Sequence, residues 1–175
     1  MIKLITPEGI YCKDDWFKDE NTIKVFLAGT IDDGISDDWQ YSLISKLLYY
    51  NENNTGFDKE DVSLGDLIIY SPRRKNWDPN SSNEEIIKQI EWEQEKLDDS
   101  DLIIMYLKDD SKSPVSLLEL GLYGPQGKMI VFCTDKFYRF NNVKCTCKKY
   151  GIDLLETNNL DDVANKINQI YNEIK

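Results

Sequence analysis

The fold of this chain is indicated first by one nearly continuous apolar run, Lys24-Val25-Phe26-Leu27-Ala28-Gly29-Thr30, which stops at a glycine before a polar loop. A strand that is buried on both faces, as in a parallel sheet covered by helices, has this composition. Further strands are expected wherever the chain becomes apolar again over a few residues, at 2–6, 66–70, 101–107, 128–133 and 152–155.

Amphipathic helices are predicted between these strands. They are expected to begin near short polar side chains that suit N-caps, at Ser36, Ser82, Ser113 and Asn159. Buried strands that alternate with amphipathic helices predict an α/β protein, a three-layer α/β/α sandwich around a mostly parallel sheet. A length of 175 residues suits a single domain, which we place at 1–175.

The charge of the chain limits its partners. Its formal net charge is -11, whereas nucleic-acid binding depends on clustered Lys and Arg side chains that release counterions. A nucleic-acid polymer is therefore disfavoured, and a small molecule or a protein is favoured. No stretch approaches the roughly 20 apolar residues of a membrane span. Because the first residues also lack a long apolar region, we expect a cytoplasmic protein.

The absence of histidine restricts the chemistry that the chain can perform. Ser-His-Asp and Cys-His arrangements are excluded, so proton transfer falls to carboxylates, Tyr, Lys or Cys. The four cysteines are expected to be reduced thiols, since no secretion signal is recognised. Cys145-Thr146-Cys147 lacks the further ligands that tetrahedral zinc needs, so no metal or other cofactor is expected.

One carboxylate stands early in an otherwise apolar helix, in the segment Ser113-Pro114-Val115-Ser116-Leu117-Leu118-Glu119-Leu120-Gly121. Val115, Leu118 and Leu122 have the spacing of one apolar face, and Glu119 lies beside that face. A carboxylate at the rim of a cleft, partly desolvated and kept ionised by the helix dipole, suits a nucleophile. An ordinary solvated Glu near a helix start is the other interpretation of this segment.

A second carboxylate, Glu93, completes the apolar stripe of the helix that starts near Ser82. The other members of the stripe are Ile86, Ile90 and Leu97. Burying an unpaired carboxylate on an inward face costs several kcal/mol, so Glu93 requires either a partner or a function.

Polar segments follow the expected strands at one edge of the sheet. The strand that ends at Gly29-Thr30 leads through a loop into a helix start, which is the usual arrangement of a ligand-binding corner. The loop after the next strand, 71–79, carries the only basic cluster, including Arg73 and Arg74. This loop either binds an anion or a base, or balances surface charge.

Five segments together resemble the nucleoside 2-deoxyribosyltransferase-like family. They are Val25-Phe26-Leu27-Ala28-Gly29-Thr30-Ile31, Ser71-Pro72-Arg73-Arg74, Gln89-Ile90-Glu91-Trp92-Glu93, Ser100-Asp101-Leu102-Ile103 and Leu118-Glu119-Leu120-Gly121. The resemblance implies a flavodoxin-like fold and cleavage of an N-glycosidic bond in nucleoside salvage. It also implies that Glu119 attacks the anomeric carbon of the sugar, and that a second base or water resolves the glycosyl-enzyme.

The chain departs from the family pattern around the expected nucleophile. The family's Tyr that hydrogen-bonds the nucleophile is Phe26 here, and an Asp that contacts the base corresponds to Glu93. A further Asp, six residues before the nucleophile, is replaced by Ser113. Related hydrolases of deoxynucleoside monophosphates carry an Arg for the phosphate where this chain has Asp32. A free nucleoside is therefore favoured over a 5'-phosphate, unless the 71–79 loop supplies the positive charge.

The expected site combines two catalytic carboxylates, Glu119 and Glu93, with substrate-binding residues. The latter are Phe26, Gly29, Thr30, Asp32, Arg73, Arg74, Ser113, Ser116 and Asn142. In the transferases a neighbouring subunit completes the site with an Asn, to which Asn141 or Asn142 corresponds loosely here, so a homo-oligomer is expected. The expected partners are a nucleoside and a free base. A module that binds a nucleoside without turnover is the alternative, motivated by Phe26 and Ser113.

Overall fold

The computed structural model of the chain describes residues 2–11, 22–31, 36–53, 67–75 and 80–174. Their centre is a seven-stranded sheet of order β2-β1-β4-β3-β5-β6-β7. The strands are β1 (Ile2–Thr6), β2 (Gly9–Tyr11), β3 (Ile23–Gly29), β4 (Leu67–Tyr70), β5 (Leu102–Leu107), β6 (Met129–Cys133) and β7 (Asp153–Leu155). All neighbouring strands are parallel except the β1–β2 hairpin at one edge.

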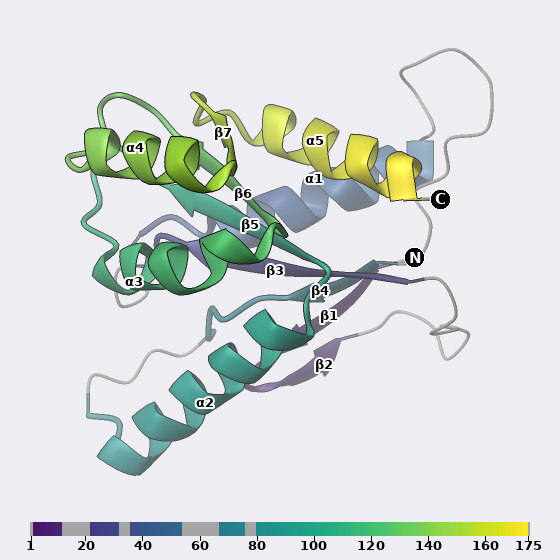
Figure 1. Cartoon of the computed structure of the whole chain (residues 1–175). Helices are drawn as coiled ribbons and strands as arrows, with labels where there is room; N and C mark the ends of the chain where they lie inside the picture. The colour runs from purple at the N-terminus through teal and green to yellow at the C-terminus, as the bar shows by residue number, and fades with distance from the viewer. Residues whose placement is uncertain (1, 12–21, 32–35, 54–66, 76–79, 175) are drawn as a thin grey trace.

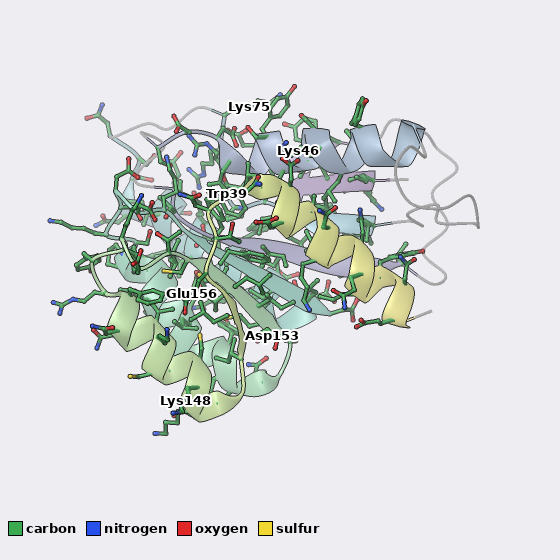
Figure 2. All side chains as sticks on the ribbon, turned by 90° about the horizontal axis from the view of Figure 1, so that it is seen from above. Trp39, Lys46, Lys75, Lys148, Asp153 and Glu156 are labelled. Carbon is green, nitrogen blue, oxygen red and sulfur yellow. The ribbon has the colours of Figure 1, made fainter. Side chains whose placement is uncertain are left out.

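Helices cover both faces of this sheet (Figure 1). They are α1 (Trp39–Asn53), α2 (Asn83–Asp99), α3 (Pro114–Tyr123), α4 (Phe140–Tyr150) and α5 (Leu160–Ile174), with a short 3₁₀ turn, η2 (Gly124–Gln126), after α3. On one face α1 and α5 lie side by side (Figure 2), joined by an ion pair of 2.6 Å between Lys46 Nζ and Asp161 Oδ1. The other face carries α2, α3 and α4. The predicted three-layer α/β/α sandwich with a mostly parallel sheet is confirmed.

The central strand β3 joins the two halves of the core. Val25 and Leu27 pack into the cluster under α1 and α5, while Phe26 and Ala28 pack into the cluster under α2, α3 and α4. Fully burying a side chain the size of Leu27 stabilises a fold by about 1.5–3 kcal/mol. The apolar composition of this run therefore reflects burial on both faces of the sheet.

Three buried hydroxyl groups connect β3 to the loop that leads into α3. The Oγ atoms of Thr30, Ser111 and Ser113 lie 2.8 Å from one another in a triangle. The backbone N–H of Lys108 donates a further bond of 3.0 Å to Thr30 Oγ1. We call Thr30, Ser111 and Ser113 the hydroxyl triangle. It fixes the residue at which α3 begins.

The helices differ from the sequence prediction in which side chains they bury. The capping box of Ser82 and Glu85 is present at the start of α2. The predicted apolar face of α3 is wrong, because Val115, Leu118 and Leu122 are 58%, 61% and 57% exposed. The buried side chains of α3 are instead Ser116, Leu120 and Tyr123. On α2, Leu97 is buried as predicted, but Ile86 and Ile90 are exposed.

Two elements were not predicted. The β2 strand pairs with β1 through only three residue pairs, too few for a sequence pattern. The α4 helix lies in a segment that is aromatic and basic, and its apolar stripe is short: Phe140, Val143 and Cys147. Cys133, Cys145 and Cys147 are free thiols, and Cys12 lies outside the described residues. Among the helices that the structure describes, none has the length and apolar character needed to cross a membrane.

Replacing a glycine by alanine should have opposite effects on stability at two positions, Gly29 at the end of β3 and Gly121 within α3. Gly29 has φ +130°, and a Cβ added there would lie 2.0 Å from the backbone oxygen of Tyr106. We expect Gly29→Ala to lower the free energy of unfolding by at least about 2 kcal/mol. A Cβ on Gly121 meets nothing within 4 Å, so Gly121→Ala is expected to raise it by up to about 1 kcal/mol. Urea unfolding of both variants measures the difference, and equal effects would contradict the close approach at Gly29.

Candidate active site

A cavity of about 530 Å³ opens where β3 ends and the N-terminal half of α3 passes α2. Four parts of the chain form it: the last residues of β3, the loop after β4, the inner side of α2, and the first turns of α3. The lining residues are Phe26, Ala28, Gly29, Ile31, Pro72, Arg74, Ser81, Ile86, Gln89, Ile90, Glu93, Ser113, Pro114, Val115, Ser116 and Glu119. We call this space the main cavity.

Glu119 enters the main cavity from α3. Its carboxyl group is largely withdrawn from water, and this burial, together with the negative charge of Glu93, raises its pKa from 4.5 to about 8. Among the described residues, none donates a hydrogen bond to it. Phe26 lines the same cavity, packs against Trp92 at 6.5 Å between ring centroids, and has no group that could donate a hydrogen bond. Glu119 is therefore a poorly solvated carboxyl group that is protonated in part at neutral pH.

Glu93 faces Glu119 from α2 and is held by its own helix. Gln89, one turn earlier, donates a hydrogen bond of 2.8 Å from Nε2 to Glu93 Oε1. The same Nε2 donates to the backbone oxygen of Pro72 at 3.3 Å. Burial raises the pKa of Glu93, while the bond from Gln89 and the positive charge of Arg74 act in the opposite direction. Both neighbours thus favour the ionised form of Glu93.

The two arginines of the basic loop have different surroundings. Arg73 turns away from the main cavity, donating from Nη2 to the backbone oxygen of Ser36 at 2.6 Å and lying 3.5 Å from Asp38 Oδ2. Arg74 lines the main cavity. The structure therefore offers Arg74 to a ligand, and uses Arg73 to tie the loop to the start of α1.

The remaining predicted site residues are distributed unevenly. Phe26, Gly29, Ser113 and Ser116 line the main cavity, whereas Thr30 is fully buried behind it in the hydroxyl triangle. Asp32 lies outside the described residues. Ser113 was predicted to cap α3 with its hydroxyl group, and this prediction is wrong. The hydroxyl group bonds to Thr30 and Ser111 instead.

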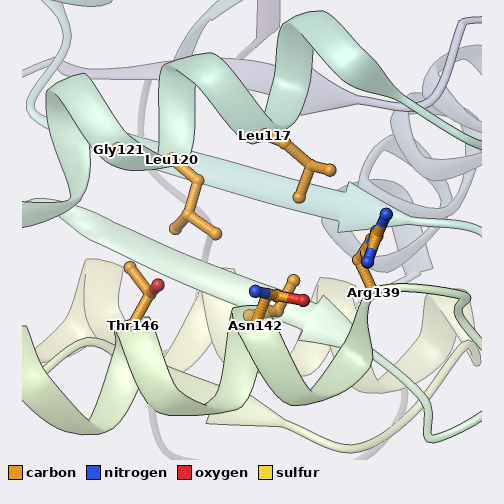
Figure 3. Close-up of a pocket in the computed structure, with 7 residues that line it drawn as sticks. Leu117, Leu120, Gly121, Arg139, Asn142 and Thr146 are labelled. Atoms are coloured by element: carbon orange, nitrogen blue, oxygen red, sulfur yellow. The ribbon is translucent and has the colours of Figure 1, made fainter.

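Asn142 lies in a different hollow, of about 270 Å³, between α3 and α4. In Figure 3, Asn142 and Thr146 of α4 and Arg139, just before α4, lie opposite Leu117 and Leu120 of α3. Neither Glu93 nor Glu119 lines this hollow. A single copy of the chain therefore does not bring Asn142 to the two carboxylates.

Among the lining residues that were not assigned to the site from the sequence, Gln89 bonds directly to one of the two carboxyl groups. Gln89 precedes Glu93 by four residues, a spacing that places two side chains side by side on a helix. This spacing could have indicated from the sequence that Gln89 contacts Glu93. Within the described ranges, no group of three or more Cys, Asp and Glu side chains is arranged to hold a metal ion.

Comparisons with known proteins agree with this architecture. A family model described as "Nucleoside 2-deoxyribosyltransferase like" matches residues 22–137, which include both carboxylates and the basic loop. No curated protein matches the chain. The fold is similar to the crystal structure of a conserved protein from Enterococcus faecalis V583, with a TM-score of 0.54, 12% identity, and coverage of 85% of this chain and 99% of that chain. At this identity the likeness concerns the fold alone.

The raised pKa of Glu119 predicts how stability changes with pH. The folded chain holds the Glu119 proton up to about pH 8, whereas an unfolded chain releases it near pH 4.5. The contribution of Glu119 to the free energy of unfolding should therefore fall as pH rises between these values. Denaturant unfolding at pH 5, 6, 7 and 8 measures it, and Glu119→Gln should flatten the slope. Glu91→Gln, at an exposed position of α2, is the control, and equal slopes in wild type and Glu119→Gln would refute the assignment.

Proposed function

The chain belongs to the nucleoside 2-deoxyribosyltransferase-like family, and on this basis we propose that it cleaves the N-glycosidic bond of a deoxynucleoside, with Glu119 as nucleophile. The observation that carries the proposal is the meeting of two carboxyl groups, Glu119 and Glu93, in one cavity that is large enough for a nucleoside. Most enzymes that cleave glycosidic bonds use two carboxyl groups that flank the reacting sugar. No metal or other cofactor enters the proposed reaction.

The reaction proceeds in two displacements. An oxygen of the Glu119 carboxylate bonds to C1' of the sugar, while the C1'–N bond breaks and its electron pair passes to the base nitrogen, which takes up a proton. The resulting glycosyl ester is then attacked at C1' by a nitrogen of a second base, or by the oxygen of water. Either attack restores the Glu119 carboxylate, and the proton lost by the attacking group leaves through Glu93 or solvent.

The environment of Glu119 makes the first step slow at neutral pH. Only the ionised carboxylate attacks, and its pKa is raised to about 8 by burial and by Glu93. Phe26 gives no hydrogen bond that would stabilise the charge. The observed rate should therefore increase with pH up to about 8.

The substrate assignment follows from the same surroundings. Arg74 is the cavity-lining arginine, and it lies near Glu93, the residue that corresponds to the family's base contact. We therefore propose a free nucleoside as substrate, handled in cytoplasmic nucleoside salvage with a free base as acceptor.

Glu119→Gln should abolish glycosidic cleavage while the fold stays intact, because the amide keeps the shape of the side chain and loses the nucleophilic charge. Chromatography of a deoxynucleoside incubated with wild type and variant measures the cleavage, and circular dichroism checks the fold. Undiminished cleavage by the variant would exclude Glu119 as nucleophile. Wild-type binding without any product, across the common deoxynucleosides and their monophosphates, would favour the non-catalytic binding module, an alternative that Phe26 supports.

The partition between transfer and hydrolysis gives a separate prediction. A transferase must keep water from the glycosyl ester until the bases have exchanged. Phe26 and Ser113, in place of the family's Tyr and Asp, weaken the control of this ester. We expect slow cleavage, with added free base diverting only part of the sugar into a new nucleoside. Chromatography of deoxynucleoside plus a different free base tests this. Complete exchange without free deoxyribose would instead indicate a dedicated transferase.

We also propose that a second copy of the chain covers the mouth of the main cavity. The two helices that line it, α2 and α3, carry six exposed apolar side chains, which we call the apolar ridge: Ile86, Ile87 and Ile90 of α2, and Val115, Leu118 and Leu122 of α3. Three of them also line the cavity. A neighbour seated on the ridge would shield the reacting atoms from water and bury surface that a monomer leaves exposed.

Leu118→Glu should separate the copies, since it places a charge in the centre of the apolar ridge. Light scattering coupled to size-exclusion chromatography should give an oligomer for wild type and at least a tenfold weaker association for the variant. Tyr41→Glu is the matched control, because Tyr41 is equally exposed but lies on α1 in the opposite layer. A monomeric wild type at micromolar concentration would rule out this assembly.

A further inference from the structure

We infer that the main cavity recognises a 2-amino-6-oxopurine, the guanine type of base, through Glu93 and Arg74, with Gln89 as a positioning residue. This inference rests on the proposed function, since it takes the base of a nucleoside as the ligand. It adds a base edge and two residues, Arg74 and Gln89, to the two carboxylates already assigned.

Glu93 presents acceptors in a fixed direction. Its Oε1 accepts from Gln89 Nε2 at 2.8 Å, and the same Nε2 also donates to the backbone oxygen of Pro72 at 3.3 Å, so two hydrogen bonds hold the amide nitrogen of Gln89. Among the described residues, no side chain donates to Glu93 Oε2. The carboxylate therefore keeps lone pairs on both oxygens for a ligand that brings adjacent N–H donors.

Arg74 supplies the complementary donor at a usable separation. The two charges are near enough for the guanidinium to lower the pKa of Glu93, yet no ion pair within 4.0 Å joins them. The only hydrogen bond from the Arg74 side chain to a described residue is a long one, 3.4 Å from Nη2 to the backbone oxygen of Glu85. A planar ligand edge fits between a carboxylate and a guanidinium placed in this way, and most of the guanidinium donors remain available to it.

The order of polar groups selects among the bases. A guanine edge carries O6, N1–H and N2–H₂ in succession, so the two N–H groups meet Glu93 while O6 accepts from Arg74. Adenine and cytosine each place a ring acceptor beside their amino group, which the Glu93 carboxylate repels. Thymine offers one N–H between two carbonyl oxygens, and one of these would face the carboxylate. Among the common bases, only guanine offers two adjacent N–H donors to the Glu93 carboxylate together with an acceptor for Arg74.

Space and packing agree with a purine. The main cavity of about 530 Å³ exceeds what a purine nucleoside fills, and apolar side chains from three elements flank it: Phe26 of β3, Ile90 of α2 and Val115 of α3. These side chains provide the apolar contact that the faces of a base require. The sugar then lies towards Glu119, and the polar edge of the base towards Glu93.

Binding to the Glu119→Gln variant tests the inference without turnover. Isothermal titration should rank deoxyguanosine first. Deoxyinosine, which lacks only the 2-amino group, should bind about tenfold more weakly, as should 2-aminopurine deoxyriboside, which lacks O6 and N1–H. Deoxyadenosine, deoxycytidine and thymidine should bind more weakly still. Equal affinities, or a pyrimidine or adenine nucleoside in first place, would overturn the inference, as would no binding of any of them.

Second substitutions in the same variant separate the roles. Arg74→Met should lower the affinities for deoxyguanosine and deoxyinosine about tenfold. The affinity for 2-aminopurine deoxyriboside should change by no more than about twofold. Glu93→Gln should bring the ratio of deoxyguanosine to deoxyinosine affinity close to one. Gln89→Met should lower that ratio without lowering the melting temperature. Lys88→Met, which removes an equal charge from the exposed side of α2, is the control and should leave every ratio unchanged.

Failure of this inference is distinguishable from failure of the proposed function. Wild-type cleavage of deoxynucleosides without preference for deoxyguanosine would overturn the base assignment alone. The predicted ranking of affinities, together with no cleavage by wild type, would overturn the proposed reaction alone. A ranking that survives both Arg74→Met and Glu93→Gln would refute the assigned contacts.

Discussion

The main cavity depends on the hydroxyl triangle. Thr30, at the carboxyl end of the central strand, holds Ser111 and Ser113 through bonds of 2.8 Å, and Ser113 adopts a left-handed conformation with φ 42°. That conformation costs a residue with a side chain about 1–2 kcal/mol, which the three buried hydrogen bonds offset. Because α3 starts directly after Ser113, the triangle decides which side of α3 faces α2. It thereby turns Glu119 into the cavity.

This orientation places two carboxyl groups in one poorly solvated space. The two carboxyl groups differ, because Arg74 and Gln89 stabilise the negative charge of Glu93, whereas no described residue does the same for Glu119. The proton therefore resides preferentially on Glu119 until a ligand arrives. A ligand that engages Glu93 through N–H groups spreads its negative charge and makes ionisation of Glu119 easier. Occupation of the cavity and ionisation of Glu119 are therefore expected to be linked through this pair.

The same rotation of α3 explains its exposed apolar residues. With Ser116, Leu120 and Tyr123 directed to the core, Val115, Leu118 and Leu122 are directed to solvent. Val115 and the exposed Ile86 and Ile90 of α2 line the main cavity together, so part of this exposed apolar surface adjoins the cavity. An apolar helix face outside a core is typical of an interface, and here it adjoins the candidate active site.

The sequence by itself determined the layers of the fold and the two carboxylates. Runs such as 25–29 and 102–107 carry no charged residue and are almost wholly apolar, as strands covered on both faces require, so the parallel sheet follows from composition. The tertiary structure alone decided which face of α3 is buried, since periodicity identifies an apolar stripe but not the partner that covers it. It also decided that Arg74 and not Arg73 lines the main cavity. Adjacent residues of a loop have no periodic constraint, and Arg73 is held away by a hydrogen bond to Ser36 and an ion pair with Asp38, both distant in sequence.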